Sequence, residues 1–189
     1  MASLTMSDLS YYEPMRKNWF IVQFTDIVGT ESTGEDPEAL SIACKTCDIP
    51  HLTTTENKVD RINDIVYTPG KSEYQTISLS FNEYIQYSSK EGSGNTRRSA
   101  GEILSDWQQK VHSPKTGVQG SKSSIAKNCA IVQINGDGSV VRVWNVYSCW
   151  PTDVQYSNLD SADGAVQDVT VTLRYDWAEM TNTAISAAV

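Results

Sequence analysis

Cysteines and histidines are the residues of this chain that could bind a metal or act in catalysis near neutral pH. The sequence has four Cys and two His. Cys44-Lys45-Thr46-Cys47 has the spacing of half a zinc site or of a redox pair, but Cys129 and Cys149 do not supply the second closely spaced pair that zinc needs. Positions three apart in a strand point to opposite faces, so we expect Cys44 and Cys47 to bind no metal. Buried structural cysteines are the better interpretation.

The remaining candidates for chemistry are isolated. His51 follows a proline in a predicted loop, and His112 lies at a predicted helix C-terminus, where a cation suits the helix dipole. Asp160-Ser161-Ala162-Asp163-Gly164 has some features of a calcium loop but lacks the downstream Glu, so a polar turn is expected. The sequence contains no phosphate-binding loop, dinucleotide fingerprint or HExxH motif. We therefore expect no catalytic residue, no metal and no cofactor, and we predict that the protein is not an enzyme.

Composition limits the class of protein. The chain has 189 residues, of which 39% are hydrophobic, enough for one domain with its own core. Its 23 acidic and 15 basic residues give a net charge of −8, which disfavours gripping nucleic acid through phosphates. The charge is compatible with simple solubility, or with a surface past which nucleic acid slides. No secretory signal and no membrane-spanning stretch is recognised, which favours reduced cytosolic thiols.

The elements that must position these residues are mostly strands. Alternation over 168–177 predicts one strand, with Val169, Val171, Leu173, Tyr175 and Trp177 on its buried face. Further strands are expected at 18–24, which is apolar on both faces, at about 39–48, and at 75–84. A hairpin is expected over 129–147, with its turn at Asn135-Gly136-Asp137-Gly138. Residues 29–37 have the composition of a loop. Trp144 falls on the same face as Arg142, which leaves open a subunit contact for its ring.

One helix and one long polar segment complete the pattern. Ser99-Ala100-Gly101-Glu102 is a capping box, and the helix that follows should end near His112 and cover the β-structure. The segment 53–71 is predicted to be a long loop with a short helical turn. It carries both signs of charge and branched apolar residues that can be buried only against something else. Packing back on its own domain is the alternative.

Taken in order, several segments resemble tail tube proteins of contractile-tailed bacteriophages. The resemblance spans roughly residues 18–177. It is carried by Asn18-Trp19-Phe20-Ile21-Val22-Gln23-Phe24, Cys44-Lys45 with Ile49-Pro50, Ile77-Ser78-Leu79-Ser80-Phe81-Asn82, Trp107-Gln108, Ala130-Ile131-Val132, and Trp150-Pro151-Thr152-Asp153-Val154 followed by Val169 to Trp177.

The resemblance implies a mainly β fold: a two-sheet β-barrel or sandwich with one flanking α-helix and a long extended inter-ring loop. It implies an arm at 1–17, a tail-tube domain at 18–177 and a C-terminal tail at 178–189. The expected function is structural: hexameric rings stack into the inner tail tube of a virion and form the channel for genome delivery.

The resemblance also suggests site residues and partners. The inter-ring contact is expected at Lys58, Val59, Asp60, Arg61, Ile62, Asp64 and Ile65. The candidate lumen-facing residues are Thr76, Ser78, Ser80 and Asn82, whose uncharged side chains would give passing DNA nothing to bind. Expected partners are further copies of the chain, the tail sheath, tape-measure, baseplate and tail terminator proteins, and genomic DNA in passage without sequence-specific binding; no membrane is expected. The protein would assemble in the host cytoplasm and reside in the virion tail.

Three alternatives stay open. The chain could form the inner tube of a related contractile injection system, such as type VI secretion or a tailocin. Baseplate proteins that initiate the tube share the fold, so an initiator is the second alternative. The third is a monomeric β-barrel that binds a small molecule inside, which needs a closed barrel with an apolar cavity.

Overall fold

The structure is a computed structural model that describes the chain except for residues 1–13, 26, 28–35, 86–97, 163 and 183–189. Its strands are β1 (Phe20–Thr25), β2 (Cys44–Cys47), β3 (Leu52–Asp60), β4 (Ile65–Tyr74), β5 (Ile77–Asn82), β6 (Lys127–Ile134), β7 (Val140–Tyr156), β8 (Asp168–Arg174) and β9 (Trp177–Asn182). Its helices are α2 (Asp36–Ala43), α3 (Ala100–Val111) and α4 (Lys122–Ile125). The prediction of a mainly β fold is confirmed.

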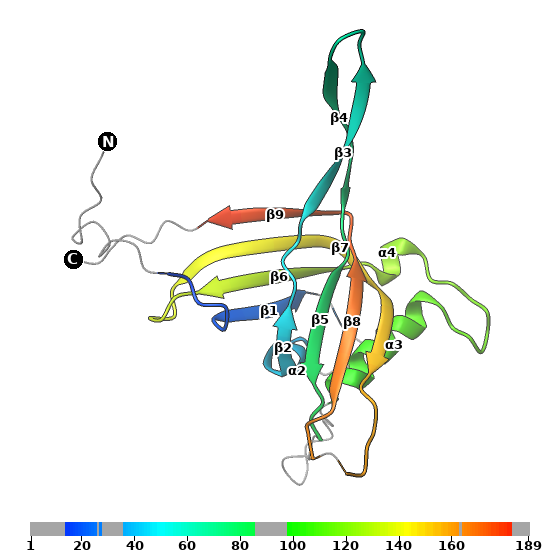
Figure 1. The fold of residues 1–189 in the computed structure, drawn as a ribbon. Helices are drawn as coiled ribbons and strands as arrows, with labels where there is room; N and C mark the ends of the chain where they lie inside the picture. The colour runs from blue at the N-terminus through cyan, green and yellow to red at the C-terminus, as the bar shows by residue number, and fades with distance from the viewer. Residues whose placement is uncertain (1–13, 26, 28–35, 86–97, 163, 183–189) are drawn as a thin grey trace.

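One long strand, β7, joins the two halves of the main sheet. The strand order is β1-β6-β7-β8-β5-β2, with β9 also paired to β7. The first half of the 17-residue β7 pairs with β6 and β9, and its second half pairs with β8. Two four-stranded layers result: the β1 layer, β1-β6-β7-β9, and the β5 layer, β7-β8-β5-β2. In Figure 1 their strands run at a steep angle to one another.

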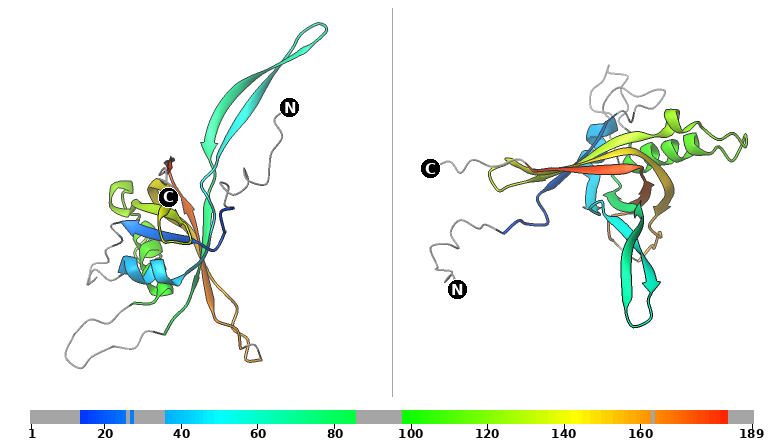
Figure 2. Two further views of the ribbon diagram at one scale, coloured as in Figure 1. Left: turned by 90° about the vertical axis from the view of Figure 1, so that its left-hand side faces the viewer. Right: turned by 90° about the horizontal axis from the view of Figure 1, so that it is seen from above.

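Alternation in the strands builds the core. Ile77, Leu79 and Phe81 of β5 are fully buried, as predicted, and so are Val169, Val171 and Leu173 of β8. These six face the helices, because α2 and α3 lie on one side of the β5 layer (Figure 2). The ring of Phe24 packs edge-on against Trp107 of α3, with centroids 6.2 Å apart, and tilted against Phe81 at 6.4 Å. The core therefore lies between the two layers and α3.

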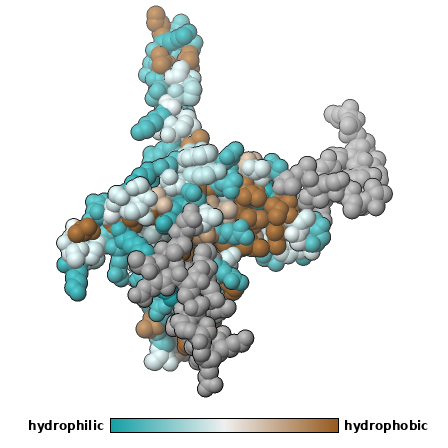
Figure 3. Space-filling view, turned by 180° about the vertical axis from the view of Figure 1, so that it is seen from behind, coloured by the Kyte–Doolittle hydropathy of each residue, from teal (hydrophilic) through white to brown (hydrophobic). Residues whose placement is uncertain are grey.

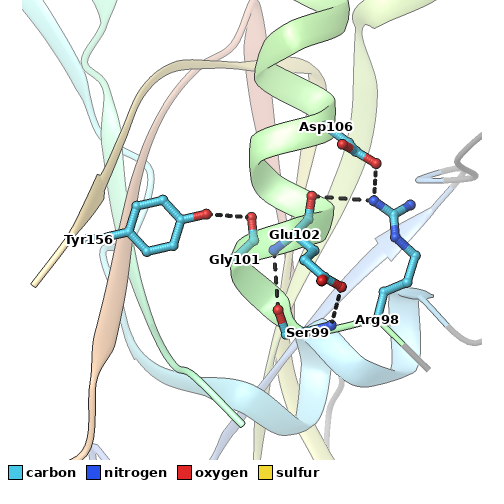
Figure 4. Close-up of polar contacts among 6 residues, drawn as sticks. All are labelled: Arg98, Ser99, Gly101, Glu102, Asp106 and Tyr156. Atoms are coloured by element: carbon cyan, nitrogen blue, oxygen red, sulfur yellow. Dashed lines mark hydrogen bonds and ion pairs between the residues drawn. The ribbon is translucent and has the colours of Figure 1, made fainter. Parts of the chain in front are cut away.

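Local signals at the start of α3 act as the sequence predicts. The side chain of Ser99 accepts from the Glu102 N–H, and Glu102 Oε2 accepts from the Ser99 N–H, which completes the capping box (Figure 4). Arg98 pairs with Asp106 one turn further on. Tyr156 Oη donates to the Gly101 carbonyl oxygen at 2.9 Å and ties α3 to the end of β7 (Figure 4).

One predicted element near the N-terminus is wrong. Residues 39–48 are not one strand: α2 extends to Ala43, and only Cys44–Cys47 form β2. Leu40 and Ala43 are buried one helical turn apart, and this spacing outweighs the β-propensity of the segment. The expected loop at 29–37 lies largely outside the described residues. The single helix expected at α3 is joined by α2 and α4.

Two further expectations need correction in the C-terminal half. The strand predicted over 168–177 stops at Arg174, and β9 begins at Trp177 on the other layer. Trp177 is thus 46% exposed and stacks on Tyr147, with centroids 4.1 Å apart, instead of sharing the buried face. Trp144 is only 7% exposed within its own chain, so a subunit contact is not needed to bury it.

None of the helices within the described ranges combines the length and apolar character that crossing a membrane would require.

Candidate assembly surfaces

The segment 53–71 forms an isolated antiparallel hairpin rather than a loop with a helical turn. Among the described strands, β3 and β4 pair only with each other, and they project away from the two layers (Figure 1). Val59 pairs with Val66, so these residues lie opposite each other on two strands and not on one helical face. The alternative that the segment folds back on its own domain is contradicted, because all nine residues of β3 are exposed.

The hairpin is stiffened by its own contacts. Thr54 Oγ1 and Ser72 Oγ share a hydrogen bond of 2.8 Å across the strands, and Thr55 Oγ1 donates to the Lys71 carbonyl at 3.0 Å. A bulge between Thr54 and Glu56 interrupts the register there. At the tip the Arg61 N–H donates to the Asp64 carbonyl oxygen at 2.8 Å.

The predicted contact residues all lie at the distal half of this hairpin. They are Lys58, Val59, Asp60, Arg61, Ile62, Asp64 and Ile65. Ile62 at the tip is 99% exposed, and Val59 and Ile65 are about half exposed. Lys58 pairs with Asp60 at 2.9 Å. An isolated two-stranded hairpin is marginally stable in water, so a surface that covers its apolar residues would stabilise it. The geometry brings the seven residues together; their role as an inter-ring contact stays a prediction.

A second surface is the polar face of the β5 layer, opposite the helices (Figure 2). Ser78 pairs with Thr172, Ser80 with Thr170, and Asn82 with Asp168. Asp153 and Gln155 of β7 continue the same rows beyond β8. Lys45 Nζ neutralises Asp168 at 2.6 Å. Three of the four candidate lumen residues therefore belong to a broad polar face on which hydroxyl and amide groups lie beside Asp153 and the Lys45–Asp168 pair. Thr76 is exposed just before β5.

A third surface, missed by the sequence reasoning, is an apolar patch on the β1 layer. Ile21, Val132 and Val143 lie side by side across three strands. Ile21 is 37% exposed and the two valines are partly buried. Figure 3 shows apolar side chains gathered over these strands. The signal was present at 18–24, which is apolar on both faces, but it indicated a strand covered on both sides within its own chain.

The four cysteines are buried or partly buried in the packed interior of the fold. A bulge between Cys44 and Thr46 lets both Cys44 and Cys47 pack against the core, so the expectation of opposite faces is wrong. Burial raises the pKa of Cys44 and of Cys149 to about 12, and it also raises the pKa of Cys47 and of Cys129 above the usual thiol value. The thiolate that metal binding or nucleophilic attack requires is therefore disfavoured at neutral pH. Among the described residues, no group of three or more His, Cys, Asp or Glu could hold a metal ion.

The two histidines belong to different parts of the fold. His51 is exposed between β2 and β3. His112 ends α3, where its N–H donates to the Gln108 carbonyl oxygen at 3.1 Å, and it forms an isolated bridge with Gln119. In the calcium-like turn, Asp160 Oδ1 accepts from the Ala162 N–H at 2.9 Å; Asp163 lies outside the described residues.

These features define a mainly β protein with a two-layer core, a bare polar face and a projecting hairpin. Residues 93–179 match the family model of the T4-like virus tail tube protein gp19. Among curated protein sequences, none matches this chain.

Solved structures with a similar fold come from contractile injection machines. One is the sheath-tube complex of an extracellular contractile injection system, PVC, in the extended state: 20% identity, TM-score 0.62, covering 96% of this chain and 100% of that chain. Another is the baseplate of the anti-feeding prophage (AFP): 14% identity, TM-score 0.64, covering 92% and 99%. A third is the tube-terminating cap of AFP: 17% identity, TM-score 0.60, covering 91% and 93%.

The match of residues 93–179 and the similar folds both point to tail tube proteins of contractile injection systems, so the resemblance is confirmed. The tail tube fold accounts for the two layers and the few helices.

Proposed function

We propose that the chain stacks as hexameric rings into the inner tail tube of a contractile particle, and that the tube is the channel for genome delivery into the host. The β3–β4 hairpin carries the proposal. It exposes branched apolar residues far from the core of its own chain, and assembly would cover them. The match of residues 93–179 to a tail tube family supports the same function.

In this assembly the hairpin crosses from one ring to the next. Its distal half carries Lys58, Asp60, Arg61 and Asp64, which offer both signs of charge to a complementary surface. Val59, Ile62 and Ile65 lose their contact with water there. Burial of each such side chain is worth roughly 1.5–3 kcal/mol relative to full exposure, less for the two that are already half covered.

The polar face of the β5 layer lines the channel. Thr76, Ser78, Ser80 and Asn82 carry no charge, and Lys45 neutralises Asp168 at the end of the same rows. A wall of hydroxyl and amide groups that also carries the carboxylate of Asp153, and on which the cation Lys45 is already paired, does not bind phosphates as free Lys and Arg do, so DNA passes without sequence-specific binding. The helices on the opposite side of the layer then face outward, and contacts between neighbouring subunits cover the patch at Ile21.

The partners follow from this geometry. Further copies of the chain form the rings and the stack, a sheath protein surrounds the tube, and baseplate and terminator proteins close its ends. The similar structures include a sheath-tube complex, a baseplate and a terminating cap, which supports these partners. Inside the tube we infer a tape-measure protein before ejection and genomic DNA during it. Assembly takes place in the host cytoplasm, and the protein resides in the virion tail.

A related contractile injection system is the second candidate. The PVC and AFP structures resemble this chain over 90% or more of its length. A tube-initiating baseplate protein is a variant of the same architecture. We expect no catalysis and no cofactor in either case. The monomeric barrel that binds a small molecule is the third reading, and it predicts one chain per particle in solution.

Electron microscopy of the purified protein tests the proposal. We expect hollow tubes or short stacks of hexameric rings above a threshold concentration. Sedimentation at micromolar concentration should give hexamers and larger species. A protein that stays monomeric in both measurements, and forms no tubes in particles from its source, would overturn the tube function.

A further inference from the structure

The molecule has two opposite ends along the direction of β5 and β8. The hairpin projects from one end, and the described residues of the connection from β7 to β8, 157–162 and 164–167, lie toward the far end (Figures 1 and 2). Leu159 in that connection is 85% exposed, and Val166 is 62% exposed. These two are the large apolar residues among the described positions of the connection, and both are exposed.

A pocket of about 490 Å³ lies at the base of the hairpin, at the other end of the molecule. Tyr74, Ile125 and Trp150 are among its apolar lining residues, and Gln119, Lys122 and Asp176 are among its polar ones. The Lys122 ammonium pairs with the Asp176 carboxylate at 2.6 Å. Arg174 pairs with Glu73 on the side of the hairpin.

The pocket is formed in advance. Trp107 Nε1 donates to the Ile125 carbonyl oxygen at 2.8 Å, which fixes the end of α4 to α3. Tyr74 packs on Tyr175 with ring centroids 5.5 Å apart, and Tyr74 Oη donates to the Ala178 carbonyl oxygen at 3.3 Å. A rigid pocket can accept a side chain without first being ordered, so binding costs less conformational entropy.

The length of the hairpin determines which part of a neighbouring copy lies next to this pocket in a stack. A strand of nine residues spans about 30 Å, so the tip of the hairpin extends well beyond its own body. When two copies stack along this direction with their bodies in contact, the hairpin lies alongside the upper body. The far end of the upper copy then meets the base of the hairpin on the lower copy. Ser72, Glu73 and Tyr74 line the pocket and belong to β4, so this contact is continuous with the hairpin contact.

We propose that the pocket at the hairpin base receives the β7–β8 connection of the next copy in the stack, with Leu159 as the side chain that enters it. The inference rests on the proposed stacking and adds its acceptor site. The contact joins two different surfaces of the same chain. It therefore leaves a free pocket at one end of the stack and a free loop at the other, and the stack can grow.

Cross-linking between two single-cysteine additions tests the contact. Purified Leu159→Cys and Gln119→Cys subunits are mixed, assembled and treated with a short bismaleimide, and dimers are identified on a denaturing gel and by mass spectrometry. We expect a dimer joined through positions 159 and 119. Wild-type protein shows the background from the native cysteines. The matched control pairs Leu159→Cys with Ile42→Cys, a 68% exposed position on α2, and should give no dimer above that background.

A second variant tests the same contact without cross-linking. Leu159→Asp should leave hexameric rings intact but raise the protein concentration needed for tubes at least tenfold, whereas Leu159→Met should assemble almost as the wild type does. Ile42→Asp, at a 68% exposed apolar residue on α2, is the matched control and should still stack.

The outcomes separate the two proposals. Wild-type tubes without the 159–119 dimer, or with normal growth of Leu159→Asp, would overturn the acceptor site and leave the tube function standing. Wild-type protein that forms neither rings nor tubes would overturn the tube function, and the acceptor site with it.

Discussion

The backbone N–H of Ser148 donates a hydrogen bond of 3.1 Å to the Asn128 side-chain oxygen where β7 passes from one layer to the other. Ser148 has a φ of 56°, in the left-handed region that non-glycine residues seldom adopt. Asn128 lies within a register shift of β6, between Lys127 and Cys129. The bulge in β6 and the left-handed residue in β7 lie where β7 leaves the β1 layer and enters the β5 layer. They therefore set the angle between the two layers.

Substitutions at this junction should separate backbone strain from side-chain contacts. Ser148→Gly should keep or slightly raise thermal stability, because glycine adopts this φ without a steric penalty. Ser148→Val should destabilise by about 1–2 kcal/mol, since a β-branched residue tolerates the conformation poorly. Asn128→Ala should cost about 0.5–1.5 kcal/mol through the lost hydrogen bond. Denaturant unfolding measures all three; equal losses for Gly and Val would contradict the role of the backbone.

Gly101 should not tolerate a side chain. A Cβ there would lie 2.8 Å from the Tyr156 ring and 2.9 Å from Glu83 Oε2. Glu83 Oε2 accepts from the Gly101 N–H at 2.9 Å, so it cannot move away freely. We expect Gly101→Ala to destabilise by about 1–3 kcal/mol, although alanine is the better helix former. Thermal melting gives the change. The comparison is Gln109→Ala, at an exposed position of the same helix, and Gly101→Ala melting at or above the temperature of this control would refute the close contact.

The hairpin tip should be needed for tube growth and not for folding. Arg61→Glu combined with Ile62→Asp changes side chains that contact no core residue, so the subunit should melt within a few degrees of the wild type. Tube length in electron micrographs should fall to single rings. Lys17→Glu with Ile42→Asp is a control of the same charge change outside the hairpin. Long tubes from the hairpin variant would show that the tip is not the ring-to-ring contact.

The lumen prediction can be tested with charge. Ser80→Lys adds one cation for every subunit to the face of hydroxyl groups, and DNA should then bind the channel wall. We expect tubes of normal length but slower genome release that recovers as salt is raised. Ser80→Thr is the neutral control. Unchanged release at low salt would place this face away from the DNA.

Loss of the Cys149 thiol proton from the unfolded chain should lower the free energy of unfolding above pH 9. Burial raises the pKa of this thiol from 9.0 to about 12, so the folded protein keeps a proton that the unfolded chain has lost. The contribution is intact below pH 9 and is lost as the pH rises from 9 toward 12. Between pH 8 and pH 10, Cys149→Ala should therefore lose about 1 kcal/mol less of its free energy of unfolding than the wild type does. Urea unfolding at both values measures this, and parallel losses in the two proteins would contradict it.

The sequence alone was sufficient to predict the elements that depend on residues within one segment. The capping box at Ser99 and the alternation at Ile77, Leu79 and Phe81 depend on spacing along one segment, and the structure has both. The charged and apolar mixture in 53–71 correctly indicated an exposed segment that its own core does not bury.

Pairing between distant segments decided the rest. Alternation continues through Tyr175 and Trp177, yet β9 leaves β8 and pairs with β7, because the register with Tyr147 lets Trp177 stack on its ring. Val59 and Val66 fit a helical turn in sequence, but cross-strand hydrogen bonds make them opposite members of a hairpin. The bulge at Cys44 likewise depends on β5. Strand partners, unlike helix faces, are not encoded within one segment, so only the tertiary structure fixed the two layers and the surfaces they present.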